Sequence, residues 1–289
     1  MSHRPYRSVL YIPASRARAL EKAQTMPVDA IIFDLEDAVA VSEKENARAL
    51  LAQTLEAGGY GPRAQIARIN GFDTEWGAAD LEAIAAVGPQ AVLLPKVNAA
   101  ADIGALAARL DQIPSARNTT IWAMMETPRG ILNAAEIAAA PRMAGMVMGT
   151  NDLAKDLGTR QRADREPMVT SLGLCVLAAR AAGIAIVDGV YNAFKDEDGL
   201  RAECEQGRDM GFDGKTLIHP AQVAVANEVF APTDDEIALA ARQIEAFDAA
   251  TAAGQGVAVV DGRIVENLHV ETARATLAKA DAIKELEDA

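Results

Sequence analysis

Two acidic residues, Glu126 and Asp152, each follow a short apolar run whose composition is typical of a buried strand. The runs cover Thr120–Met125 and Met143–Met148, and a stretch long enough for one helix separates them. If the two runs form neighbouring parallel strands, both carboxylates leave the sheet at the same carboxyl edge, where strand–helix repeat enzymes hold their active sites. This arrangement predicts a site for a hard divalent cation.

The donor types favour Mg²⁺ as that cation. Imidazole could come only from His3, His219 or His269, none of which lies beside the two carboxylates in the sequence. Mg²⁺ commonly binds one or two carboxylates and completes its octahedron with water and substrate oxygens. A 2-oxo acid would complete such a site through its carboxylate and carbonyl oxygens, and the polarised carbonyl would favour making or breaking a carbon–carbon bond.

Further polar residues stand at the ends of the other apolar runs. Arg68 would face the same cavity, where a fixed guanidinium can stabilise a developing enolate or alkoxide oxygen. Each such residue alone could equally cap a helix or form a solvated ion pair, but their concentration at one rim favours catalysis. The set comprises Asp34, Glu36, Asp37, Arg68, Asn70, Lys96, Glu126, Asp152, Asp188 and Lys215.

Eight short apolar runs, most of them followed by a longer Ala-, Leu-, Glu- and Arg-rich stretch, predict the elements that hold these residues. Alternation of strand and helix with buried strands implies parallel pairing and right-handed crossovers. Eight units within ~220 residues match an α/β fold of the (β/α)8 barrel type. The runs are Ser8–Ile12, Ala30–Phe33, Gln65–Ile69, Ala91–Leu94, Thr120–Met125, Met143–Met148, Ile184–Val187 and Phe212–Leu217.

The pattern changes beyond Pro220. Helical spacing returns over Thr233–Ala253, a turn at Asp261 and Gly262 predicts a hairpin, and a last helix is expected over Val270–Leu286. We therefore predict a catalytic barrel over residues 1–230 and a helix–hairpin–helix extension over residues 231–289. The extension is short for an independent domain, so we expect it to pack on the barrel or on a neighbouring subunit.

Composition limits the possible partners. The formal net charge of −13 argues against nucleic acid, because binding a phosphate backbone requires a positive field. No apolar run approaches the roughly 20 residues of a membrane span, and the amino terminus lacks the apolar core of a signal peptide, so we expect a cytoplasmic protein with no membrane partner. Cys175 and Cys204 lack CxxC spacing and are interpreted as core thiols.

Seven segments, in this order along the chain, resemble the citrate lyase beta-subunit-like branch of the HpcH/HpaI aldolase superfamily, which includes malyl-CoA and citramalyl-CoA lyases and (3S)-malyl-CoA thioesterase. The resemblance covers roughly residues 4 to 285. The segments are Arg7–Pro13, Phe33–Val39, Arg68–Asn70, Leu94–Val97, Met125–Thr127, Gly149–Leu153 and Gly214–Pro220.

The resemblance implies roles for residues of the rim. It implies Mg²⁺ bound by Glu126 and Asp152 and an enolate stabilised by Arg68, in agreement with the roles argued from residue type. It also implies that Glu36 and Asp37, together with Asp34, order the water molecules of the metal.

Contacts to coenzyme A are likewise implied by the resemblance. Arg16 and Lys22 are similar to family residues that bind the phosphates of coenzyme A, although both could equally be ordinary charges on a helix surface. Gly149 and Thr150 lie where backbone amides of the family hold the carboxylate of the 2-oxo acid, and a loop entering a helix suits that role.

The carboxy-terminal hairpin departs from the family pattern. Family lyases carry an Asp after Asp-Gly-Lys-Met-Ile, thought to act as acid or base on the adjacent subunit, whereas this chain has Glu266 there, after Asp261-Gly-Arg-Ile-Val265. A Glu could perform the same proton transfer with a different reach, position a water, or simply be an exposed hairpin residue. His269, close by, could orient Glu266 or cover the rim.

The function implied is an Mg²⁺-dependent lyase that breaks or forms a carbon–carbon bond in a 3-hydroxy-3-carboxyacyl thioester such as malyl-CoA, with acetyl-CoA and glyoxylate as products. Three alternatives stay open: a (3S)-malyl-CoA thioesterase, a citrate lyase beta subunit that acts on an acyl-carrier-protein thioester within a complex, and a non-catalytic barrel. Trimers and hexamers are usual in the family, so a homo-oligomer is expected.

Overall fold

The computed structural model describes residues 4–160 and 162–288, so His3 lies outside the described residues. In this part of the chain eight parallel strands, paired in sequence order, form a closed barrel, which confirms the predicted (β/α)8 fold. Pairing of β8 with β1, with Thr216 opposite Val9, closes the barrel. The strands are β1 (Ser8–Pro13), β2 (Ala30–Asp34), β3 (Ala64–Arg68), β4 (Ala91–Leu94), β5 (Thr120–Met125), β6 (Met143–Met148), β7 (Ala185–Asp188) and β8 (Gly214–Leu217).

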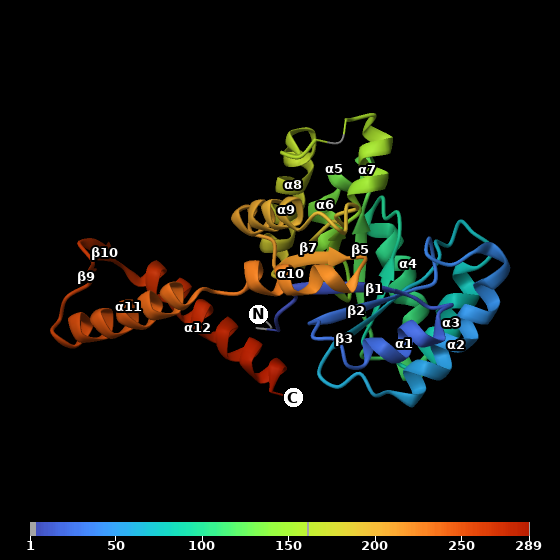
Figure 1. Ribbon diagram of the computed structural model, residues 1–289, viewed down its shortest axis with the longest axis horizontal. Helices are drawn as coiled ribbons and strands as arrows, with labels where there is room; N and C mark the ends of the chain where they lie inside the picture. The colour runs from blue at the N-terminus through green and yellow to red at the C-terminus, as the bar shows by residue number, and fades with distance from the viewer. Residues whose placement is uncertain (1–3, 161, 289) are drawn as a thin grey trace.

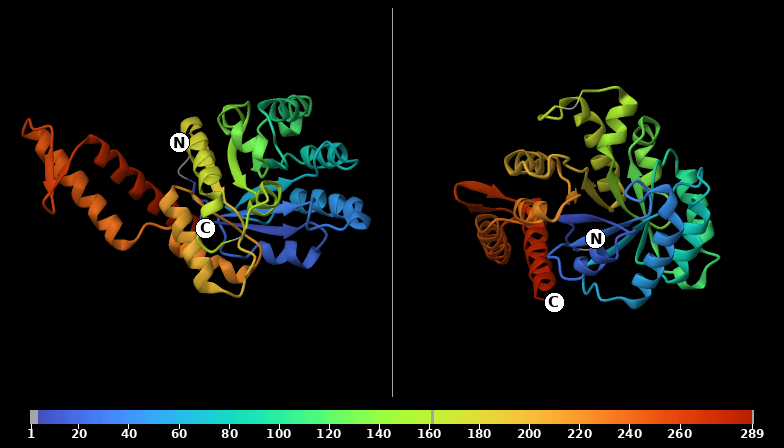
Figure 2. Two further views of the ribbon diagram at one scale, coloured as in Figure 1. Left: turned by 90° about the horizontal axis from the view of Figure 1, so that it is seen from above. Right: turned by 45° about the vertical axis from the view of Figure 1, so that its right-hand side comes forward.

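Helices surround the strands (Figures 1 and 2). Strands covered on both faces need apolar residues at nearly every position, which explains the uninterrupted apolar runs. Side chains such as Ile32 and Trp122 fill the barrel interior, whereas Ile31 and Phe33 pack against the helices. The helices are α1 (Ala17–Ala23), α2 (Lys44–Ala57), α3 (Gly77–Ala86), α4 (Ala100–Leu110), α5 (Pro128–Leu132), α6 (Ala134–Ala138), α7 (Thr150–Leu157), α8 (Val169–Ala182), α9 (Glu197–Met210) and α10 (Val223–Phe230), with short 3-10 turns at Val41–Glu43, Pro114–Ala116, Glu166–Met168 and Pro220–Gln222.

Predicted and observed strand limits agree within one residue, except at the start of β8. Phe212 was expected to begin that strand, but the strand starts at Gly214. A Cβ on Gly214 would collide with the backbone of Tyr6 and Arg7, so only glycine permits the close approach of β8 to the chain that enters β1.

The carboxy-terminal extension is a helix, a hairpin and a second helix: α11 (Asp234–Ala252), β9 (Ala258–Val260), β10 (Arg263–Val265) and α12 (Asn267–Glu287). Thr233 caps α11 by accepting the N–H of Glu236. The extension projects from one side of the barrel, with the hairpin at its far end (Figure 1). Helix α12 returns toward the barrel, where Glu287 lies 3.0 Å from Arg7. The division at residues 230 and 231 stays a prediction.

None of the helices in the described ranges is long and apolar enough to cross a membrane.

Candidate active site

A cavity of about 300 Å³ lies at the carboxyl ends of the strands and brings together Arg68, Glu126 and Asp152. Arg68 ends β3, Glu126 follows β5, and Asp152 lies in the first turn of α7, just beyond β6. Because β5 and β6 are neighbours in the barrel, the two carboxylates meet at one edge as the sequence predicted. Asp34 and Asp37 line the same cavity.

Glu126 is held by its surroundings and is only 3% exposed. Its Oε1 accepts the backbone N–H of Lys96 at 2.7 Å. Gly149 lies against the other side: a Cβ at that position would collide with the Cβ of Glu126 and lie 2.5 Å from its Oε2. Burial raises the pKa of Glu126 to about 7, while the Lys96 N–H and Arg68 oppose the rise and Asp152 adds to it. The cost of burying the carboxylate therefore outweighs the stabilisation that Arg68 and the Lys96 N–H provide.

The charges of the cavity are unbalanced. Among its described lining residues, four carboxyl groups, from Asp34, Asp37, Glu126 and Asp152, face one guanidinium, that of Arg68. Within residues 4–160 and 162–288 no group of three or more His, Cys, Asp or Glu side chains has the arrangement of a complete metal site. Two hard oxygen donors in a negative cavity fit Mg²⁺, which leaves most of its coordination to water and substrate.

Arg68 is fixed by carboxylates from the loop after β2. Its Nε and Nη2 donate to the two oxygens of Asp34 at 2.7 and 2.6 Å, and its Nη1 lies 2.6 Å from Oε2 of Glu36 and 3.4 Å from Oδ2 of Asp37. Burial alone would lower the pKa of Arg68, but Asp34, Tyr11 and Glu36 raise it well above its usual value. The guanidinium is therefore permanently charged and held in one orientation.

Glu36 and Asp37 differ in their surroundings. Glu36 is 9% exposed, and burial raises its pKa to about 7 against the opposing effect of Arg68, whereas the side chain of Asp37 is 69% exposed. The loop that carries them is secured by Lys44, whose Nζ donates to the carbonyls of Leu35 and Glu36 at 2.7 Å. Glu36 thus contacts Arg68 from a fixed loop, and its expected role toward the metal's waters stays a prediction.

Two residues expected at the rim lie elsewhere. Asp188 and Lys215 are completely buried on the outer side of the sheet, where Lys215 lies 3.2 Å from Asp188 and 2.6 Å from Glu203 of α9. Successive strand residues point to opposite faces, and Val187 occupies the barrel interior, so its neighbour Asp188 points outward. Arg165 completes this buried group, 2.7 Å from Asp188. These charges support the sheet and do not line the active-site cavity.

Tyr11 is a cavity residue that the sequence analysis missed. The guanidinium carbon of Arg68 lies 5.0 Å from the centroid of the Tyr11 ring, and the Tyr11 hydroxyl donates to Sδ of Met124 at 3.4 Å. An aromatic residue inside an apolar run is normally interpreted as core. The available signal was its position, two residues after Val9, on the inward face of the first strand.

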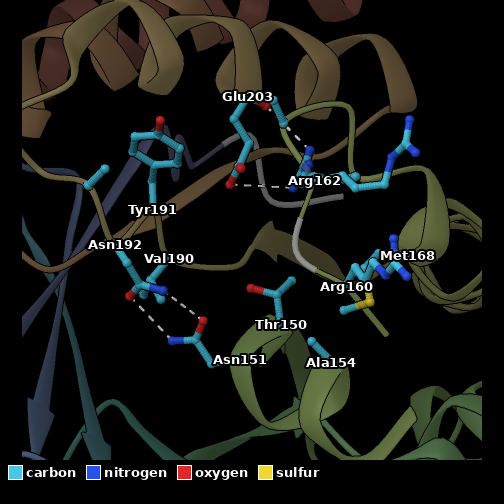
Figure 3. A pocket seen from close by; sticks show the side chains of 13 residues that line it. Thr150, Asn151, Ala154, Arg160, Arg162, Met168, Val190, Tyr191, Asn192 and Glu203 are labelled. Carbon is cyan, nitrogen blue, oxygen red and sulfur yellow. Dashed lines mark hydrogen bonds and ion pairs between the residues drawn. The ribbon is translucent and has the colours of Figure 1, made fainter. Parts of the chain in front are cut away.

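A second cavity of about 360 Å³ adjoins the first (Figure 3). The two share the lining residues Thr150, Asn151, Val190 and Asn192. The amides of Asn151 and Asn192 bond each other in both directions, at 2.8 and 3.3 Å, and Figure 3 shows the pair facing across the gap between α7 and the loop after β7. The side chains shared by the two spaces are therefore all uncharged.

The residues expected to bind ligand anions lie at two places. Arg16 and Lys22 are exposed, at the start and in the last turn of α1, and do not line the active-site cavity. Gly149 and Thr150 do line it. The N–H of Gly149 already donates to the carbonyl of Met125 at 3.1 Å, so the amides without an acceptor inside the helix begin at Thr150, the first residue of α7.

Glu266 lies in the extension, where it is exposed and precedes α12. Its N–H donates to Nδ1 of His269 at 3.1 Å, so His269 caps the start of α12. Glu266 is not among the residues that line the cavity of its own chain. A catalytic role for Glu266 therefore needs the cavity of another subunit.

Comparison with known proteins agrees with this geometry. Residues 7–220 match the family described as HpcH/HpaI aldolase/citrate lyase. The chain is 67% identical over 285 residues to (3S)-malyl-CoA thioesterase of Cereibacter sphaeroides, covering 98% of both proteins. It is 35% identical over 284 residues to citrate lyase subunit beta of Escherichia coli, covering 96% of this chain and 94% of that protein.

A solved structure extends the likeness to the whole chain. The structure of CitE from Mycobacterium tuberculosis in complex with magnesium, acetoacetate and coenzyme A is 32% identical and superimposes with a TM-score of 0.78, covering 96% of this chain and 99% of that one. With the barrel, the ordered motifs and these relatives in agreement, the chain belongs to the HpcH/HpaI aldolase/citrate lyase family.

Proposed function

We propose that the chain is an Mg²⁺-dependent enzyme that acts on the coenzyme A thioester of a 3-hydroxy-3-carboxy acid, with malyl-CoA as the first candidate. The observation that carries this proposal is the meeting of Glu126, Asp152 and Arg68 in one cavity with an excess of carboxyl groups. An anionic acyl group enters such a cavity only if a cation offsets that charge. The names of the thioesterase relatives and the ligands in the CitE structure support the same substrate class.

Glu126 and Asp152 would hold the ion, which supplies a Lewis acid for the oxygens of the hydroxy or oxo acid. Arg68 faces the cavity with its position fixed by Asp34, so it can stabilise an oxygen that gains negative charge. The amide of Thr150, at the start of α7, is suited to the carboxylate of the acyl group.

Two reactions fit these residues. In hydrolysis, water adds to the thioester carbonyl and the carbon–sulfur bond breaks, which gives malate and coenzyme A. In lyase chemistry, the hydroxyl loses its proton and the carbon–carbon bond breaks, which gives glyoxylate and an enolate that is protonated to acetyl-CoA. In both, the thioester oxygen carries developing negative charge, and Arg68 would serve it.

Hydrolysis of malyl-CoA is the outcome best supported by likeness, because the thioesterase relatives are 65–67% identical over nearly the full chain. Carbon–carbon cleavage is supported by the likeness to citrate lyase beta subunits, at 34–35% identity. A chain that acts only within a complex on a carrier-protein thioester is the third candidate, and turnover of a free coenzyme A ester by the isolated protein would exclude it.

The test is product analysis on malyl-CoA with Mg²⁺. Malate and free coenzyme A in equal amounts would establish hydrolysis, and glyoxylate with acetyl-CoA would establish the lyase. Both should disappear with excess chelator and with Glu126→Gln. No product from malyl-CoA or from a panel of related hydroxyacyl thioesters would overturn the proposal.

We also infer that the protein is a cytoplasmic homo-oligomer, a trimer or hexamer, in which the extension of one subunit brings Glu266 to the cavity of the next. The position of Glu266, outside the cavity of its own chain, supports this inference. Arg16 and Lys22, both exposed on the helix that follows β1, would contact the phosphates of coenzyme A.

A further inference from the structure

Tyr11 is a residue of the active-site cavity whose hydroxyl has a weak hydrogen-bond partner. Tyr11 lines the cavity, and its hydroxyl donates to the thioether sulfur of Met124 at 3.4 Å. A thioether is a poor acceptor, so a ligand oxygen would be a better one. Burial raises the pKa of the Tyr11 hydroxyl far above its usual value, although Arg68 opposes the rise, so this group keeps its proton and remains a donor at neutral pH.

Arg68 already pairs with carboxylates of its own chain. Its Nε and Nη2 each donate a hydrogen bond to Asp34, and its Nη1 lies near the carboxylates of Glu36 and Asp37. These carboxylates neutralise much of the guanidinium charge before any substrate arrives. A neutral donor beside Arg68 therefore adds stabilisation that the guanidinium alone does not provide.

The two groups lie side by side because of the barrel. Tyr11 points inward from β1, opposite Ile32 of β2, and Arg68 points inward from β3, opposite Asp34 of β2, and the guanidinium packs over the Tyr11 ring at 5.0 Å. The ring fixes the position of the hydroxyl, and Tyr11 and Arg68 line the same cavity as Glu126 and Asp152.

We propose that Tyr11 is a catalytic residue whose hydroxyl donates a hydrogen bond to the thioester carbonyl oxygen and, together with Arg68, stabilises the negative charge that develops there. No proton is transferred, because the oxygen gains charge as the adjoining bond forms or breaks and Tyr11 stays protonated throughout. The proposal rests on the proposed function, since it requires a thioester in this cavity.

Tyr11→Phe tests the proposal because it removes the hydroxyl and keeps the ring under Arg68. We expect kcat for malyl-CoA to fall about tenfold to a hundredfold with KM changed by less than about twofold; this is less than the roughly hundredfold to thousandfold loss typical of one oxyanion donor, because Arg68 remains. Tyr6→Phe is the matched control. Tyr6 packs on Trp122, with ring centroids 5.1 Å apart, and does not line this cavity. An unchanged kcat in Tyr11→Phe, or a rise in KM alone, would overturn the proposal.

A spectroscopic measurement decides the same point without turnover. Succinyl-CoA labelled with carbon-13 at the thioester carbonyl lacks the hydroxyl of malyl-CoA, and its carbonyl stretch reports hydrogen bonding directly. We expect a shift to lower frequency on binding to the wild type and to Tyr6→Phe, and a smaller shift in Tyr11→Phe. Equal shifts in all three proteins, or none in the wild type, would refute the role of Tyr11. If the wild type turns over no thioester, the proposed function fails. The shift of the carbonyl band alone then decides whether the Tyr11 hydroxyl donates to the thioester oxygen.

Discussion

The backbone N–H of Lys96 donates to Oε1 of Glu126 at 2.7 Å, and Lys96 adopts a left-handed φ of 51° at this contact. A non-glycine residue in this region carries a conformational cost, normally on the order of 1 kcal/mol. The loop after β4 therefore accepts backbone strain in order to direct an amide at the carboxylate that is proposed to hold the metal.

Substitutions at Lys96 should distinguish the effect of its backbone conformation from the effect of its side chain on stability and on Mg²⁺ affinity. Lys96→Gly removes the strain and keeps the N–H, so we expect a gain of up to about 1 kcal/mol in the free energy of unfolding and retained Mg²⁺ affinity. Lys96→Val places a β-branched residue at positive φ and should lose about 1–2 kcal/mol and weaken Mg²⁺ binding. Urea denaturation and calorimetric Mg²⁺ titration measure the two effects, with Lys96→Ala as the control. Equal affinity in the Gly and Val variants would show that this amide does not orient Glu126.

Gly149 should tolerate no side chain. A Cβ there would collide with Glu126, so Gly149→Ala should cost about 1–3 kcal/mol of stability by overpacking and should displace the carboxylate, with loss of most Mg²⁺ binding. The matched control is Gly173→Ala in the middle of α8, where a Cβ meets no atom within 4 Å. That change should stabilise the helix by up to about 1 kcal/mol. Similar thermal denaturation curves for both variants would contradict the close packing of Gly149.

Stability of the metal-free protein should fall as the pH rises toward 8. The folded state raises the pKa of Glu36 from 4.5 to about 7, so it binds a proton more tightly than the unfolded chain. The resulting stabilisation is complete below pH 4.5 and is lost as the pH passes through about 7. Between pH 5 and 8 the loss from this group should be roughly 2–3 kcal/mol at most. Glu36→Gln should reduce the difference between the two pH values, measured by urea denaturation, whereas Glu43→Gln, at an exposed position, should not.

Mixed oligomers should reveal whether Glu266 serves a neighbouring subunit. Glu126→Gln and Glu266→Gln should each inactivate the protein alone, whereas co-expressed and co-purified chains should regain activity, because some sites combine an intact barrel with an intact extension. Random assembly predicts recovery of about one quarter of the wild-type rate. Glu266→Asp in place of Glu266→Gln tests the reach of the carboxylate. Absence of recovery in verified mixed oligomers would place every required residue within one chain.

The barrel could be predicted because its strands are buried on both faces, which leaves uninterrupted apolar runs in the sequence. The limits of β4, β5 and β6 were predicted to the residue, since polar or turn residues bound each run. The meeting of Glu126 and Asp152 followed from strand order alone. In these cases burial of a strand on both faces requires the same uninterrupted apolar run that the sequence shows.

The remaining details depend on which way a side chain points. Asp188 was expected to follow its strand as Glu126 does, but it is the last residue of β7 and faces outward, because a shift of one residue moves a side chain to the other face of a sheet. Tyr11 was hidden in an apolar run, and the clamp of Asp34 on Arg68 depends on side-chain reach across two strands. Strand ends known only to within a residue cannot fix these directions.

The paired amides of Asn151 and Asn192 form a thin wall between two spaces of about 300 and 360 Å³. This wall consists of side chains, so its thickness can change by substitution while the backbone of the barrel keeps its hydrogen bonds. Smaller residues at both positions would widen the passage between the two spaces, whose other shared lining residues are Thr150 and Val190. The scaffold therefore carries spare room for bulkier acyl groups beside the cavity that contains Glu126 and Asp152, and protein engineers could reach it with two mutations.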